Sequence, residues 1–227
     1  MEKEPKISNA LRNIAILSDL LPLILFLFFA KSKKNVGLRV AFLISLYSIV
    51  VNFFILSNRH FWQYTFVIGR FTTIVEFSLF SFLFYRIIVS SYFKNGIAII
   101  FFLVNTYLVY TLITFSKTLY DSVPVGITAM IFFIYCIFYL FERVRDASSL
   151  FLYSSPDFWV VVAIIIYSAG TFFPFIFAQS NLNKPDFDSE YILIHSTLYV
   201  LKNLLLCIAM LTKDKTQTAS YSIPKKK

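Results

Sequence analysis

Three charged side chains interrupt long apolar stretches of this sequence: Asp19, Glu76 and Lys202. A charge at the centre of a bilayer costs at least about 2.5–3.5 kcal/mol, so such residues are usually paired or functional. Glu76 precedes Arg86 by ten residues, which is about 15 Å of helix rise. Lys202 lies at a similar depth in its own run. Because successive membrane helices alternate in direction, we expect Glu76 and Lys202 to meet near the midplane, as a ligand site or a structural ion pair.

Further polar residues gather around this pair. His195, Tyr199 and Lys202 recur at spacings of four and three, which places them on one face of a helix. Asn203 adjoins Lys202, and Arg70 precedes Glu76 near the external edge. Such a set would line a polar cavity open to the outside, where an anionic ligand group could replace Glu76 beside Lys202. The ligand-binding or ion-pair candidates are Glu76, Lys202, His195, Tyr199, Asn203, Asp19 and Arg70.

Other polar residues in the apolar runs have a simpler interpretation. Single Asn, Ser and Thr side chains often form interhelical hydrogen bonds worth about a kcal/mol or less. We favour that role for Asn52, Asn105, Thr106 and Ser168. Asp19, three residues before Pro22, is open to two interpretations: it joins the cavity, or it lies shallow enough to reach external water.

The rest of the chain explains why these charges stand out. Its 227 residues are 58% hydrophobic and only 15% charged, with a mean hydropathy of +0.73. A soluble domain is about 45–50% apolar and about 25% charged. The composition therefore excludes a soluble globular domain, a disordered chain and a disulfide-rich secreted scaffold.

Seven apolar runs approach the length of about 20 residues that a membrane-spanning helix needs. They are longer than barrel strands and do not alternate polar with apolar residues. We therefore predict an all-α integral membrane protein with a seven-transmembrane-helix bundle in a single domain, residues 1–212, followed by a basic tail, 213–227. The predicted spans are 11–30, 38–56, 66–88, 97–115, 123–141, 158–178 and 191–211.

The distribution of Lys and Arg predicts the orientation. Thirteen of the 21 flank the spans on the side that carries the C-terminal tail, and seven lie on the side of the N-terminus. Since cytoplasmic loops carry the excess of basic residues, we expect the N-terminus outside and the C-terminus inside, in the inner (cell) membrane. The formal charge of +9 then needs no nucleic acid, because the sequence offers no basic groove or recognition helix.

The sequence lacks the residue sets of several known chemistries. A retinal Schiff base at Lys202 is disfavoured, because microbial rhodopsins carry an Asp one turn earlier, where this chain has Leu198. A zinc hydrolase needs about three His ligands, whereas the chain has only His60 and His195. Hydrolase and phosphate-loop motifs are also missing. We therefore expect no cofactor and no metal, and we assign no catalytic residue.

Three stretches together resemble a family of small, largely uncharacterised seven-helix membrane proteins common in Bacteroidota. They are 64–86, centred on Val75-Glu76-Phe77, then 156–173 with its Tyr167-Ser168-Ala169-Gly170 step, and 195–205. The resemblance covers nearly the whole chain. It implies signature positions at Glu76, Trp159, Gly170, His195, Lys202 and Asn203. It also implies a membrane sensor that works with a separate histidine kinase.

Three functions are consistent with these features. The leading hypothesis is a sensor or receptor-like protein that binds a small ligand in an outward-facing cavity and signals through its basic cytoplasmic loops. The second is a small-solute or proton-coupled transporter that uses Glu76 and Lys202. The third is a membrane scaffold whose buried charges only fix helix packing.

Overall fold

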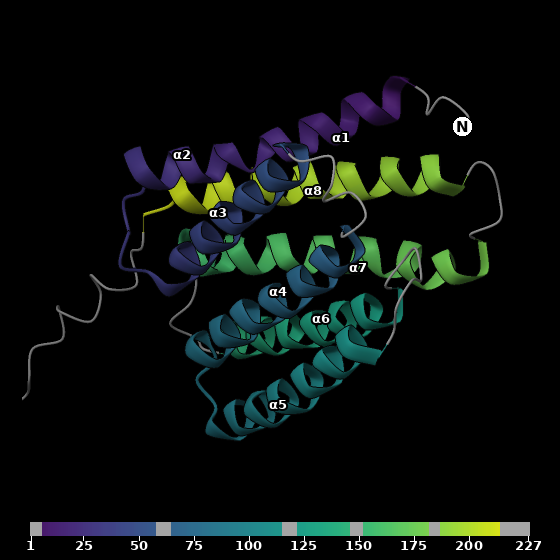
Figure 1. The fold of residues 1–227 in the computed structure, drawn as a ribbon. Helices are drawn as coiled ribbons and strands as arrows, with labels where there is room; N and C mark the ends of the chain where they lie inside the picture. The colour runs from purple at the N-terminus through teal and green to yellow at the C-terminus, as the bar shows by residue number, and fades with distance from the viewer. Residues whose placement is uncertain (1–5, 58–64, 115–121, 146–151, 182–186, 214–227) are drawn as a thin grey trace, which may run out of the picture.

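The computed structural model describes residues 6–57, 65–114, 122–145, 152–181 and 187–213. Seven helical stretches in these ranges are long and apolar enough to cross a membrane, which confirms the seven-helix prediction. His60 lies outside the described residues. The first helix begins and the last one ends at opposite ends of the bundle (Figure 1), as an odd number of crossings requires.

The helices follow the predicted runs closely. They are α1 (Lys6–Ser18), α2 (Leu20–Phe28), α3 (Val36–Ser57), α4 (Thr65–Ile87), α5 (Ser91–Thr114), α6 (Ser122–Arg145), α7 (Pro156–Asn181) and α8 (Phe187–Leu211). A single 3₁₀ turn (Leu152–Ser154) precedes α7. The first candidate span, Ala10–Phe28, combines α1 and α2.

The first span is interrupted at Asp19, between α1 and α2. Pro22 has no backbone N–H, so it cannot donate to the carbonyl oxygen of Ser18 one turn earlier, and its ring disfavours a regular helix at that point. The break therefore lacks one regular helical hydrogen bond, near the middle of the candidate span Ala10–Phe28. Asp19 lies at this break.

Several helices extend beyond the predicted spans, α5 and α6 most clearly at the ends where they meet. α5 begins at Ser91, six residues before the predicted start. Its start is held by α6, where the Glu142 carboxylate accepts hydrogen bonds from the backbone N–H groups of Val89 and Ser90, both at 2.9 Å. α6 correspondingly runs on to Arg145.

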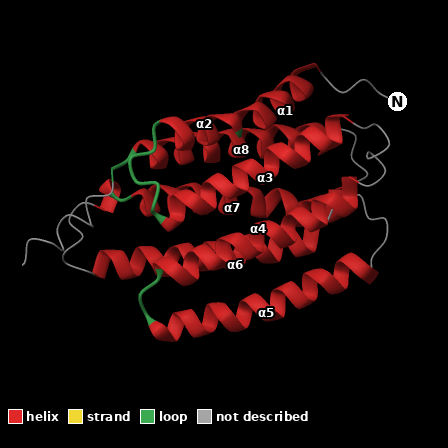
Figure 2. Cartoon of the chain, turned by 60° about the vertical axis from the view of Figure 1, so that its left-hand side comes forward, coloured by secondary structure: helices red, strands yellow, loops and turns green. Residues whose placement is uncertain are grey.

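The helices do not contribute equally to the bundle. α8 packs against α7, α1 and α2, and α7 also contacts α6 and α3. α5 lies at the edge of the bundle, mainly against α4 (Figure 2). α7 and α8 approach closely at Gly170, where an added Cβ would lie 2.6 Å from the methyl groups of Leu198.

The tightly packed apolar core occupies one half of the bundle. It lies where α3 and α7 begin and where α4, α6 and α8 end. Its largest fully buried apolar side chains include Leu38, Val40, Leu83, Phe84, Tyr139, Val160, Val161 and Met210. Buried polar side chains dominate from mid-span toward the opposite half, among them Asp19, Arg70, Thr111, Thr128, Ser168, Thr171, Ser196, Lys202 and Asn203.

The outside of the bundle is apolar. Phe28 and Ile113, for example, are 75% and 79% exposed. An exposed apolar surface of this kind needs a covering, and the seven helices of membrane length indicate lipid.

Candidate functional site

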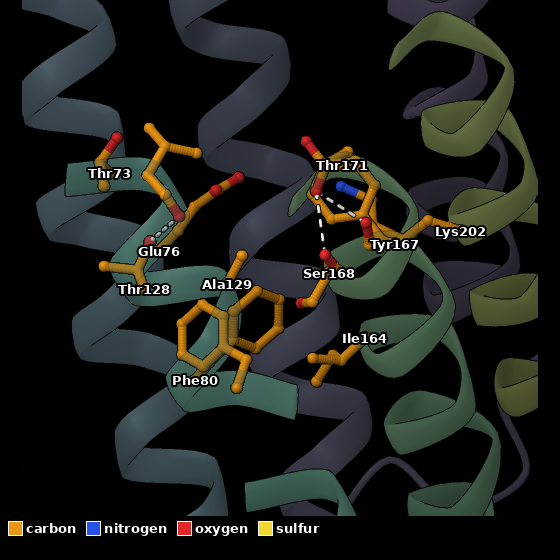
Figure 3. Close-up of a pocket in the computed structure, with 12 residues that line it drawn as sticks. Thr73, Glu76, Phe80, Thr128, Ala129, Ile164, Tyr167, Ser168, Thr171 and Lys202 are labelled. Carbon is orange, nitrogen blue, oxygen red and sulfur yellow. Dashed lines mark hydrogen bonds between the residues drawn. The ribbon is translucent and has the colours of Figure 1, made fainter. Parts of the chain in front are cut away.

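A cavity lies between α4, α6, α7 and α8, near the middle of their spans (Figure 3). Its volume of about 50 Å³ has room for a few water molecules or a small ion. The lining is polar on one side and apolar on the other. Phe80, Phe132 and Ile164 close it toward the packed core.

Glu76 and Lys202 both line this cavity. Figure 3 shows Glu76 on one side, from α4, and Lys202 on the other, from α8. No salt bridge within 4.0 Å joins them in the described part of the chain. The two residues therefore share one cavity but lie on opposite sides of it, without direct contact.

Lys202 is held by aromatic rings. Its side chain is 3% exposed, and its Nζ lies 3.8 Å from the ring centroid of Tyr199 and 4.8 Å from that of Tyr167. Cation–π attraction of this kind partly replaces hydration. Lys202 makes no hydrogen bond or ion pair with a described residue, which leaves its donors directed to the cavity.

Asp19 is the most extensively hydrogen-bonded charged group at the site. It is 1% exposed, so it does not reach the surface, and it lies beside the cavity without lining it. The Tyr199 hydroxyl donates to its two carboxylate oxygens at 3.0 and 2.8 Å. Asn203 Nδ2 donates to Asp19 Oδ1 at 3.0 Å and to Ser18 Oγ at 2.7 Å. The break in the first span is thus tied to α8.

Tyr199 links the two charged groups. Its ring faces the Lys202 ammonium while its hydroxyl donates to Asp19. Asp19 and Lys202 are also close enough for their charges to interact. These residues therefore form one electrostatic unit between the first span and α8.

His195 joins the cluster through aromatic neighbours. Its Nε2 lies 3.1 Å from the Tyr167 hydroxyl, within hydrogen-bond distance. Its ring stacks between those of Tyr191 and Tyr199, at centroid distances of 5.7 and 6.1 Å. His195 is not among the residues that line the cavity, so it supports the wall instead of forming it.

Arg70 is placed elsewhere. Its guanidinium donates to the backbone carbonyl oxygen of Thr111 in α5 at 2.6 Å, and it does not line the cavity. Arg70 therefore ties α4 to the peripheral helix α5. The structure does not bring it together with the other candidates.

Threonine hydroxyls supply acceptors on the cavity wall. Thr73 donates to the Gly69 carbonyl oxygen at 3.2 Å, and Thr128 donates to that of Val125 at 2.9 Å. Thr171 donates to Tyr167 O at 2.7 Å. Because each proton is bound within its own helix, the hydroxyl oxygens can offer the cavity only lone pairs.

Two of the residues assigned to interhelical hydrogen bonds behave differently from each other. Asn105 accepts a hydrogen bond from Ser78 of α4 at 3.2 Å, which confirms the prediction for Asn105. Thr106 instead donates to Phe102 O in its own helix.

Tyr167 is the site residue that the sequence analysis missed as a candidate. It lines the cavity, faces Lys202 and bonds His195. Its spacing of four residues from Thr171, on a helix that also carries Ser168, is the signal that could have found it.

The fold and the site define a multi-pass, seven-helix membrane protein with a charged cavity at mid-span. No protein-family model matches the chain, and neither a curated protein nor a solved structure matches it. Its function is therefore argued from its own residues.

Proposed function

We propose that this protein is a membrane sensor whose cavity, when occupied, alters the packing of α4, α6, α7 and α8. The observation that carries the proposal is the separation of Glu76 and Lys202 across a shared cavity. Two opposite charges that do not pair can be bridged, moved or released by a small ligand. A ligand of this kind shifts an equilibrium between helix arrangements by its differential affinity for them.

The cavity of the proposed sensor faces outward. The packed core closes it toward the end of the bundle that carries the basic loops and tail. By the positive-inside rule that end is cytoplasmic, with the N-terminus outside and the protein in the inner membrane. A ligand would then arrive from the external side.

The output of the sensor would leave through helices that touch both the cavity and the basic end. α6 and α8 line the cavity, and α6 ends with Arg143 and Arg145 in its last turn. A cytoplasmic partner with an acidic surface, such as a histidine kinase implied by the family resemblance, would recognise this end.

The test measures helix movement directly. Spin labels at Val144 in α6 and Thr212 after α8 would report the distance between the two cytoplasmic ends, with Cys136 and Cys207 replaced by Ala. We expect the distance distribution in nanodiscs to change between acidic and alkaline buffer, or on addition of Na⁺. Lys202→Met should abolish the change, and Lys94→Met, in α5 outside the cavity, should preserve it.

An unchanged distance in the unmodified protein under all these conditions would contradict the sensor. The charges would then serve packing alone, as in a scaffold. A scaffold also predicts that the exchange Glu76→Lys with Lys202→Glu preserves the fold and stability.

The break at Asp19 favours transport as a second candidate function. Transporter sites at mid-membrane are often built on discontinuous helices, and the first span is interrupted beside Tyr199 and Asn203. Transport predicts that the protein in liposomes moves protons or a small solute and that Glu76→Gln stops the flux. Liposomes that show no flux across a broad solute set would favour the sensor.

A further inference from the structure

The cavity wall carries one carboxylate, from Glu76, and one ammonium, from Lys202. A second buried carboxylate, Asp19, lies outside the lining and is hydrogen-bonded to Tyr199. Glu76 and Asp19 each interact electrostatically with Lys202 and with each other. Arg70 is hydrogen-bonded to the Thr111 carbonyl oxygen of α5 and does not line the cavity. A buried carboxylate without a direct partner is costly, so a positive charge placed in the cavity beside Glu76 would stabilise it.

Asp19 is already compensated. It accepts hydrogen bonds from Tyr199 and Asn203, and Lys202 faces the ring of the same Tyr199. Hydrogen bonds from neutral donors and a nearby ammonium stabilise a carboxylate. Asp19 is therefore better stabilised as a carboxylate than Glu76, which accepts no hydrogen bond from a described residue.

Glu76 is the carboxylate that lacks a direct partner among the described residues. Its carboxylate makes no hydrogen bond or ion pair with a described residue, although it lines the cavity. Thr73 and Thr128, on the same wall, offer acceptor oxygens only, because their protons are bound within their own helices. A carboxylate beside neutral oxygen acceptors is a ligand set suited to a hard cation.

The other titratable groups that act on Glu76 do not supply the charge. They are Tyr47 from α3, Tyr167 from α7 and Tyr199 from α8, and tyrosine is neutral near neutral pH. His195 is bonded to the Tyr167 hydroxyl, and its charge would be repelled by Lys202. A positive charge beside Glu76 is left to a bound cation.

We propose that the cavity holds one exchangeable monovalent cation at the Glu76 carboxylate, either a proton or Na⁺ in its place. The small cavity suits either. When the cation leaves, Glu76 becomes a free carboxylate and draws the Lys202 ammonium across the cavity; when it returns, Lys202 settles back beside Tyr199. The role of this cation as the ligand of the sensor rests on the proposed function. The binding of the cation at Glu76 does not depend on that function.

The test uses the full chain in nanodiscs and needs no partner. An infrared difference spectrum between alkaline and acidic samples should contain the carbonyl band of a protonated carboxylic acid. We expect Glu76→Gln to lose that band and Glu190→Gln, an exposed acid at the start of the last span, to keep it. Glu76→Asp retains the carboxylate, so its band should shift and not disappear.

Sodium provides the second arm. With Na⁺ as the occupant, addition of NaCl removes the band, releases a proton into weakly buffered solution and allows radioactive Na⁺ to bind, whereas choline chloride does none of these. Glu76→Gln should lose both the proton release and the Na⁺ binding. A carbonyl band that disappears in Glu76→Gln but is unchanged by NaCl supports the proton as the occupant.

A spectrum without the band in the unmodified protein, together with absent Na⁺ binding, would overturn the proposal. A band that persists in Glu76→Gln and disappears in Asp19→Asn would overturn it too, and so would proton uptake that depends on His195. The cation site and the sensor fail separately: cation binding at Glu76 with unchanged label distances refutes only the sensor.

Discussion

At the scale of single residues, the cavity illustrates how a membrane protein keeps charges in an apolar interior. Lys202 is stabilised by two tyrosine rings, and Asp19 by hydroxyl and amide donors. Neither residue depends on direct contact with its opposite charge. This leaves Lys202 free to respond to a change at Glu76.

Removal of the ammonium should destabilise the protein strongly. Lys202→Met removes the ammonium whose charge acts on buried Asp19, and leaving a buried charge without its counter-charge typically costs about 3–5 kcal/mol. The double variant Lys202→Met with Asp19→Asn also removes the Asp19 charge, so it should recover much of the lost stability. Reversible unfolding in mixed micelles measures the free energy of unfolding of the single and the double variant. Equal stability of the two would refute an interaction between Asp19 and Lys202.

The tyrosine hydroxyls should differ in importance. Tyr199→Phe keeps the ring beneath Lys202 but removes the donor to buried Asp19, so we expect a loss of about 1.5–3 kcal/mol, typical of a hydrogen bond to a charged group. Tyr167→Phe removes only the contact with His195, which in membrane helices is worth about 0.6 kcal/mol on average. The same unfolding assay compares the stability losses of Tyr199→Phe and Tyr167→Phe. A larger loss for Tyr167→Phe would contradict the greater importance of the Tyr199 hydroxyl.

At the scale of helices, the site depends on two features of α7 and the first span. Gly170 allows α7 to approach Leu198 of α8, and the ring of Tyr167, three residues earlier on α7, lies 4.8 Å from Lys202 Nζ. Pro22 interrupts the first span where Asp19 can face Tyr199. Both features are local, so each can be changed without touching a charge.

A side chain at position 170 should separate α7 from α8. Its Cβ would lie 2.6 Å from the Leu198 methyl groups, and overpacking of this kind costs about 1–3 kcal/mol. We expect Gly170→Ala to lower stability and Gly170→Ala with Leu198→Ala to restore part of it. A double-mutant cycle compares the free energies of unfolding of Gly170→Ala, Leu198→Ala and the double variant. Strictly additive changes would show that the two residues do not touch.

The helices were predictable from the sequence to a large extent, because bilayer thickness fixes the length of each apolar run. The helix ends were less predictable. The polar residues Lys94, Asn95 and Gly96 precede the predicted span 97–115, but they lie within α5. This helix begins instead beside Glu142 of α6, which accepts a hydrogen bond from the Ser90 N–H. Apolar length marks the bilayer, whereas the hydrogen bonds that end a helix are formed with another helix.

The charged site residues were predictable because a charge within an apolar run is conspicuous. Their partners were not, since spacing along one helix fixes a face but not how far the facing helix lies. Glu76 and Lys202 are consequently separated, and Asp19 instead contacts Tyr199 and Asn203. Tyr167 was overlooked because it is one of 14 tyrosines in an aromatic-rich chain.

At the scale of the whole molecule, the bundle is asymmetric along its length. Apolar packing dominates the half near the basic loops, and buried polar groups dominate from the cavity outward. A closed half beside the basic loops and a polar opposite half suit a protein that receives a ligand from the side of the N-terminus. The direction of insertion is therefore central to any function assigned to the cavity.

The two ends of α5 provide a matched test of that direction. Ser91 and Thr114 are its first and last residues, and both are exposed. Neither substitution, Ser91→Cys or Thr114→Cys, changes the basic residues that determine orientation.

In a background with Cys136 and Cys207 replaced by Ala, a membrane-impermeant maleimide applied to the outer face of the inner membrane should label Thr114→Cys. It should label Ser91→Cys only after the membrane is permeabilised. The reverse pattern would place the N-terminus and the polar half of the cavity on the cytoplasmic side, and the proposed ligand would then be an intracellular one.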